Sequence, residues 1–160
     1  MSNGLRQEDP LRRLLEQDAV ISTVNRLFRS VDEKDWAAAE ACLAPDIHVD
    51  VTSLAGGDPQ DMTASGLVAD WREGLSHLEA IHHQAGNYEV EVEGEQATAT
   101  CYGIAFHYLR NDTGRNTRRF VGTYDLNLRK VRGRWCLDRL RYNLKFVDGN
   151  TDLEGRESGA

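Results

Sequence analysis

Two histidines, His83 and His107, are the residues best suited to proton transfer near neutral pH. They lie near the open ends of a predicted β-hairpin that spans residues 80–110, so its turn brings together side chains that are distant in the sequence. His82 faces the other way, because neighbouring residues of a strand point to opposite faces. A carboxylate can fix the tautomer of a catalytic imidazole, and Asp32, at the end of the first predicted helix, is the candidate partner.

The residues alone leave both assignments open. A lone histidine on an apolar face is more often a hydrogen-bonded core residue than a catalyst. Asp32 belongs to the run Asp32-Glu33-Lys34-Asp35, which is equally typical of an exposed turn that ends a helix. The helix dipole disfavours a carboxylate at this end, so Asp32 needs a compensating partner that the pattern does not name. His48 and His77 have no evident partner in the pattern, and we leave both out of the predicted site.

The predicted strand that ends with His107 has one face of small side chains. Alternate residues of a strand share a face, and here the shared face consists of Ala97, Ala99, Cys101, Gly103, Ala105 and His107. Small side chains on the concave face of a curved sheet leave room for a ligand, although such a face can also simply pack under helices. We therefore predict a cavity beside His107.

Several ring side chains are expected to line this cavity. Phe28, Trp71 and Phe146 would make it mostly apolar, which favours a ring-sized or hydrophobic ligand. By strand parity Tyr124 and Tyr142 could also face inward and supply a hydroxyl group.

Helix signals dominate the first half of the chain. Asp9-Pro10 combines an N-cap with a proline at the first helical position. Apolar residues at helical spacing, starting with Leu11, Leu14 and Leu15, predict one buried stripe along a helix that runs to about Val31. Asp35 is expected to cap a short second helix, and residues 63–77 form a third.

Strand signals follow, in residues 47–52, in the 80–110 hairpin, and in residues 117–131 and 134–147. The order α-α-β-α-β-β-β-β predicts an α+β fold, in which a curved antiparallel sheet forms a cone against three N-terminal helices. We expect one domain over residues 9–147, a disordered N-terminus over residues 1–8 and a flexible tail over residues 148–160.

Composition narrows the possible partners and compartments. A net charge of −7 and a pI of about 5.2 argue against nucleic-acid binding. Cys42, Cys101 and Cys136 fit neither a metal spacing nor a disulfide framework, which indicates buried thiols in a reducing compartment. No stretch approaches the roughly 18 apolar residues of a membrane span, and the N-terminus lacks the apolar core of a signal peptide. We expect a cytoplasmic protein with no membrane partner.

Five segments resemble the scytalone dehydratase family. Residues 30–36 (S-V-D-E-K-D-W), followed by Leu43-Ala44-Pro45 and Ile47-His48-Val49-Asp50, resemble the start of that family. The segments His83-Gln84-Ala85-Gly86-Asn87 and Phe106-His107 resemble its two histidine-bearing strands. More broadly, residues 11–147 are similar to SnoaL-like members of the nuclear-transport-factor-like superfamily, a group of α+β cone folds that includes dehydratases, isomerases and polyketide cyclases.

The resemblance implies roles for the candidate residues. Asp32 would orient His83, His83 would abstract a proton alpha to a carbonyl, and His107 would assist the leaving hydroxyl or bind substrate, without a metal or another cofactor. Val31 and Val51 stand where scytalone dehydratase has tyrosines, so those phenolic donors are missing.

The activity so implied is that of a cofactor-independent, dehydratase-like lyase or an isomerase that acts on a small cyclic or hydrophobic substrate. A non-catalytic binding protein of the same fold remains an alternative, as does a subunit of a larger complex such as the small subunit of a ring-hydroxylating dioxygenase. The superfamily also commonly forms dimers or trimers through the open sheet face. We therefore expect a homo-oligomer, and the apolar row on that face is Tyr102, Ile104, Phe106 and Tyr108.

Overall fold

The structure is a computed structural model that describes residues 9–155. Its first element is the long helix α1 (Pro10–Asp32). The side chain of Asp9 accepts a hydrogen bond from the backbone N–H of Leu11, as expected for an N-cap that precedes a proline. The predicted disordered segment 1–8 and residues 156–160 of the predicted tail lie outside the described residues.

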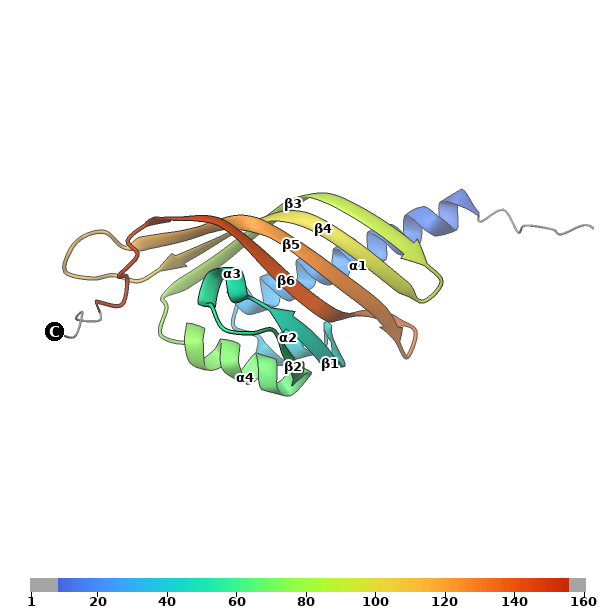
Figure 1. Cartoon of the computed structure of the whole chain (residues 1–160), viewed down its shortest axis with the longest axis horizontal. Helices are drawn as coiled ribbons and strands as arrows, with labels where there is room; N and C mark the ends of the chain where they lie inside the picture. Colours follow the sequence, from blue (N-terminus) through green and yellow to red (C-terminus); the bar gives the residue numbers. More distant parts are fainter. Residues whose placement is uncertain (1–8, 156–160) are drawn as a thin grey trace, which may run out of the picture.

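The apolar stripe of α1 is buried only in its second half. Val20, Val24 and Leu27 are fully buried, whereas Leu11 and Leu14 are exposed. The first turns of α1 extend past the end of the sheet, where no strand lies opposite them (Figure 1). The prediction that the stripe would be buried from Leu11 onward was therefore wrong, because helical spacing shows which face is apolar but not how far the sheet extends.

Three further helices follow α1 in the described residues: α2 (Trp36–Glu40) before the first strand, and α3 (Thr52–Ala55) and α4 (Ala64–Leu75) between later strands. Asp35 caps α2 through the backbone N–H of Ala38, as predicted. The one-turn helix α3 begins at Thr52, the last residue of the strand predicted over residues 47–52, because that strand ends at Asp50. It is held against the sheet by Ser53, whose hydroxyl donates to the carbonyl of Tyr142 and accepts from the N–H of Leu144.

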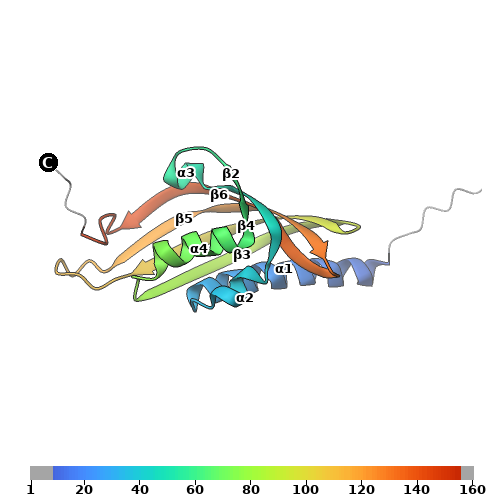
Figure 2. The same ribbon diagram turned by 90° about the horizontal axis from the view of Figure 1, so that it is seen from below.

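Six strands form one sheet in the order β2-β1-β6-β5-β4-β3. Their bounds are β1 (Leu43–Asp50), β2 (Gln60–Thr63), β3 (Ala80–Glu93), β4 (Gln96–Tyr108), β5 (Thr117–Val131) and β6 (Arg134–Gly149). All neighbours are antiparallel except β1 and β6, which are parallel. The sheet twists strongly, and α1 and α4 lie on the same side of it (Figures 1 and 2). The predicted α+β class and its helix-covered sheet are confirmed, with β2 and the parallel pair as additions.

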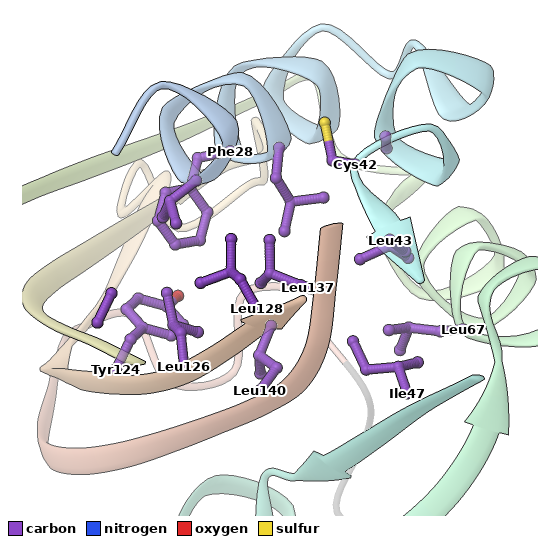
Figure 3. Close-up of a cluster of buried hydrophobic side chains, with 14 of the residues drawn as sticks. Phe28, Cys42, Leu43, Ile47, Leu67, Tyr124, Leu126, Leu128, Leu137 and Leu140 are labelled. Atoms are coloured by element: carbon purple, nitrogen blue, oxygen red, sulfur yellow. The ribbon is translucent and has the colours of Figure 1, made fainter. Parts of the chain in front are cut away.

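The core lies between this sheet face and the helices. Figure 3 shows Phe28 from α1 facing Tyr124 from β5, with leucines of β5 and β6 beside them. Leu126, Leu128 and Leu137 are almost completely buried, so the interface at this end is tightly filled. The inward face of β4 adds only small side chains there, as its pattern predicted.

Two glycines in the middle of the sheet make room for aromatic rings. Gly103 and Gly122 pair with each other across β4 and β5. A Cβ atom on Gly103 would overlap the ring of Tyr124, and one on Gly122 would overlap the carbonyl oxygen of Asn143. The rings of Tyr124 and Tyr142 can therefore approach the backbone of these glycines closely.

Gly103→Ala is expected to lower the free energy of unfolding by about 1–2 kcal/mol, because the added methyl group must displace the Tyr124 ring. Chemical denaturation measures this loss. Gly86→Ala on β3 is the matched control, since a Cβ atom there meets nothing within 4 Å. Equal stability of the two variants would contradict this account of Gly103.

Residues 148–155, the first part of the predicted flexible tail, pack against the rest of the fold. β6 continues to Gly149, and the turn that follows buries Leu153 against Leu78 and Ile81. Glu154, at the end of this turn, bonds to Arg118 of β5.

Among residues 9–155, no helix is both long enough and apolar enough to cross a membrane.

Candidate active site

Asp32 and His83 are directly bonded. Nδ1 of His83 lies 2.6 Å from Oδ1 of Asp32, and the backbone N–H of His83 donates to Oδ2 at 2.8 Å. Both side chains are largely buried, with exposed fractions of 14% and 15%. Because the carboxylate can only accept, Nδ1 carries the proton and the distal Nε2 of neutral His83 keeps a free lone pair. This is the arrangement of a general base.

The end of α1 and the regular part of β3 before Gly86 position this pair. Phe28 lies one helical turn before Asp32, and its ring stacks on the imidazole of His83 with centroids 5.3 Å apart. On β3, the pairing with β4 shifts between Gly86 and Glu89, and Asn87 has a positive φ of 55°. This bulge turns Asn87 outward, while His83 still faces the helices.

A mostly apolar cavity of about 270 Å³ opens beside His83. An apolar cavity of roughly 150 Å³ is enough to bind benzene, so this one has room for one substituted ring or two fused rings. Its polar lining groups are the imidazoles of His83 and His107, the phenols of Tyr124 and Tyr142, the indole of Trp71 and the exposed carboxylate of Asp70.

Most of the predicted site residues line this cavity. They are Phe28, Val31, Val51, Trp71, His83, His107, Tyr124 and Tyr142. Asp32 lies behind His83, to which it is bonded. Val31 and Val51 offer only methyl groups, so the two missing phenols leave this part of the wall apolar.

Phe146 is the exception, and the prediction that it lines the cavity was wrong. Its side chain is 54% exposed and lies on the opposite face of the sheet. The cause is a bulge in β6: Leu144 pairs with Gly122 but Phe146 pairs with Val121, so Lys145 is an extra residue. One extra residue exchanges the two faces of the strand beyond it.

Phe120 takes the place that we assigned to Phe146. It lines the cavity and makes an edge-on contact with His107, with centroids 5.0 Å apart. Strand parity could have found it, because Phe120 lies two and four residues before Gly122 and Tyr124 on the inward face of β5. Leu27, Leu54, Gly74, Leu75, Ala105 and Leu140 complete the lining.

His107 has a different environment from His83. Nη2 of Arg118 lies 3.3 Å from its Nδ1, and Arg118 in turn forms an ion pair with Glu154. Burial, together with the positive charge of Arg118, lowers the pKa of His107 to about 4, so the ring is neutral near pH 7. Sequence reasoning missed Arg118, because its place depends on the register across the loop 109–116.

Tyr124 and Tyr142 both remain protonated in the cavity wall. Burial raises the pKa of Tyr142 to about 12 and raises that of Tyr124 still further. The Tyr142 hydroxyl makes a long contact of 3.5 Å to the carbonyl of Gly103. Within residues 9–155 no hydrogen bond engages the Tyr124 hydroxyl, which leaves it available as a donor to a ligand.

Groups of three or more histidine, cysteine, aspartate or glutamate side chains arranged to hold a metal ion do not occur in the part of the chain that the structure describes.

Comparison with known proteins finds the same architecture elsewhere. The family described as the SnoaL-like domain matches residues 12–141. A protein from Kribbella flavida is 19% identical with a TM-score of 0.81, over 84% of this chain and 94% of that protein. No curated protein matches the chain in a sequence search.

Two further solved structures carry names that refer to chemistry. One, from Novosphingobium aromaticivorans, is provisionally named a scytalone dehydratase; it is 17% identical with a TM-score of 0.73, over 86% of this chain and 89% of that one. The hexachlorocyclohexane dehydrochlorinase LinA-type3 from Novosphingobium barchaimii is 14% identical with a TM-score of 0.72, over 89% of this chain and 95% of that one. At these identities the likeness establishes the fold alone.

Proposed function

This chain belongs to the SnoaL-like domain family, and on that basis we propose that it is a cofactor-independent, dehydratase-like lyase. The observation that carries the proposal is the Asp32–His83 pair in the wall of an apolar cavity. The names of two solved relatives, a dehydratase and a dehydrochlorinase, both denote eliminations, in which the substrate loses water or HCl.

The proposed reaction is loss of water from a cyclic β-hydroxyketone. Nε2 of His83 takes the proton alpha to the carbonyl, and the electron pair of the broken C–H bond forms an enolate. Collapse of the enolate restores the carbonyl, forms the C=C bond and expels the β-hydroxyl, which leaves as water with the proton held by His83. Asp32 stabilises the imidazolium that exists between these two transfers.

The enolate oxygen needs a hydrogen-bond donor, since such stabilisation is often the largest single contribution to catalysis. Tyr124 and His107 are the donors that the cavity offers in place of the phenols missing at Val31 and Val51. The same base and donors would also serve an isomerase, in which His83 returns the proton to a different carbon instead of releasing it with a leaving group.

A substrate panel tests the proposed reaction. Cyclic β-hydroxyketones with one or two rings, such as 3-hydroxycyclohexanone and 3-hydroxy-1-tetralone, are incubated with the protein in D₂O. We expect loss of water by mass spectrometry and deuterium at the alpha carbon by NMR, both absent with His83→Gln. Thermal protection by these compounds without either signal would instead support a binding protein.

The opposite face of the sheet supports the proposal of a homo-oligomer. Tyr102 on β4 and Phe146 on β6 are 56% and 54% exposed on this face. Val121 on β5 lies beside Phe146 and pairs with Ile104 on β4, two residues from Tyr102. Exposed aromatic side chains that gather on one face of a sheet are typical of a protein–protein contact.

Light scattering at micromolar concentration is expected to give a mass above the 18.0 kDa of one chain. The double substitution Tyr102→Ser, Phe146→Ser should reduce it to one chain, because it removes the apolar contact. Thr98→Ser, also exposed on β4, is the control and should leave the mass unchanged. A single-chain mass for the wild type would rule out this oligomer.

A further inference from the structure

An ion pair lies directly behind His107. Arg118 faces His107 across the β4–β5 pair, and its two terminal nitrogens each donate to one oxygen of Glu154 at 2.8 Å. The exposed fractions of the two side chains are only 16% and 20%. A bidentate pair with this little exposure fixes the guanidinium plane far better than a single surface contact would.

The same guanidinium determines where His107 carries its proton. Nη2 of Arg118 has two protons, of which one bonds to Glu154 and the other points at Nδ1 of His107, 3.3 Å away. Arginine cannot accept a hydrogen bond and does not lose its proton in proteins, so Nδ1 must be the acceptor. A neutral imidazole that accepts at Nδ1 carries its proton on Nε2.

Nε2 of His107 is free to meet a ligand. Among residues 9–155 no hydrogen bond reaches it, and it is not one of the buried atoms left without a partner. His107 lines the cavity and its Nδ1 is engaged by Arg118, so Nε2 is the ring nitrogen left for a ligand there.

We propose that Arg118, held by Glu154, is a positioning residue that keeps His107 as the neutral Nε2–H tautomer, so that His107 donates a hydrogen bond to an oxygen of the bound ligand. The two imidazoles thereby acquire opposite roles from opposite partners. A carboxylate leaves His83 with a free lone pair, and a guanidinium leaves His107 with a free N–H.

This inference deepens the proposed function and rests on it for the identity of the ligand. A fixed N–H donor with a buried cation behind it favours a ligand oxygen that accepts hydrogen bonds and gains negative charge, as a ketone oxygen does on enolisation. A ligand that presents an ammonium group to this end of the cavity would meet both the N–H and the cation, and it should be excluded.

The surrounding charges agree with a neutral ring. Arg118, His83 and His77 all disfavour protonation of His107, and burial does so most strongly, while Glu154 alone favours it. Since Glu154 is engaged by Arg118 and lies 3.2 Å from Nε2 of His77, its charge is largely compensated.

Histidine tautomers are distinguished directly by long-range ¹H–¹⁵N NMR spectra of the full-length protein. The signals of His107 are assigned as those absent from His107→Gln. We expect wild-type His107 to show a protonated Nε2 and an unprotonated Nδ1 throughout pH 5.5–8. Protonation of Nδ1 in this range, in either a neutral or a charged ring, would overturn the proposal without reference to any variant or substrate.

Arg118→Met tests whether Arg118 is responsible. Loss of the cation should raise the titration midpoint of His107 by about one pH unit or more, and loss of the donor should admit the Nδ1–H tautomer. Arg118→Lys, which keeps a cationic donor, should restore the wild-type tautomer. Arg119→Met is the matched control, because Arg119 pairs with Asp148 on the exposed side of the same strand.

An unchanged His107 spectrum in Arg118→Met would mean that Arg118 serves only stability. If this variant does not fold, the wild-type spectrum still decides the tautomer. None of these readouts requires turnover, so a failure of the proposed lyase activity and a failure of this inference are separate results.

Discussion

Asp32→Asn is expected to reduce turnover of a β-hydroxyketone by about 10³- to 10⁴-fold while leaving ligand binding and the fold intact. The corresponding change in a Ser-His-Asp triad costs about 10⁴-fold, because the amide no longer holds the imidazole in the required tautomer. A loss of this size is expected for the Asp32–His83 pair as well. Asp32 accepts from both Nδ1 and the backbone N–H of His83, whereas an asparagine has one oxygen for the two donors.

The amide nitrogen of the variant can also donate to Nδ1, which would move the ring proton to Nε2 and remove the free lone pair that makes His83 a base. Steady-state kinetics with the same ketones in both proteins measure the effect. Asp70→Asn is the control, because Asp70 also lines the cavity but is exposed. It should change turnover less than about threefold. Comparable losses of turnover in Asp32→Asn and Asp70→Asn would mean that catalysis depends on the negative charge near the cavity and not on the hydrogen bond between Asp32 and His83.

The Asp32–His83 pair was largely predictable from sequence. A carboxylate at a helix C-terminus needs a partner, strand parity separates His83 from His82, and the family resemblance names the pair. None of this depends on an exact register. His83 faces inward despite the bulge in β3, because the bulge begins only after Gly86, three residues further along the strand.

The cavity wall far from this pair was less predictable, because it depends on local irregularities. Lys145 is one extra residue in β6, and no pattern in the sequence marks it, yet it moves Phe146 to the other face of the sheet. The pairing of His107 with Arg118 depends on how the loop 109–116 closes. The contact with Glu154 depends on a turn after the last strand, where polar composition alone indicated a flexible tail.

Glu154 links the turn after β6 to the candidate site, because it bonds to Arg118, which contacts His107. Burial acts to raise its pKa, but the hydrogen bonds from Arg118 and His77 outweigh this effect and lower the pKa to about 2. A carboxyl group whose pKa is lower in the folded than in the unfolded state stabilises the fold at neutral pH. That contribution is present above the unfolded pKa and is lost as the pH falls through the folded value. For Glu154 this places the loss between about pH 5 and pH 2.

Glu154→Gln is therefore expected to lower the free energy of unfolding by about 2–3 kcal/mol at pH 7, an amount reduced from the full pKa difference to allow for partial exposure. The difference in the free energy of unfolding between wild type and variant should become smaller as the pH falls below 5, and it should nearly vanish at pH 2. Urea denaturation of both proteins across this pH range measures this difference. Because all other titrating groups are common to the two proteins, their contributions cancel when one free energy is subtracted from the other.

Glu79→Gln provides the comparison, because Glu79 forms an ion pair with Arg110 at an exposed position. Solvent screens such a pair, so its effect on stability should be clearly smaller at every pH. A gap for Glu154→Gln that stays constant with pH would show that its carboxylate charge does not stabilise the fold. In that case Arg118 would not depend on Glu154 for its position, and the N–H of His107 would have to be fixed by Arg118 alone.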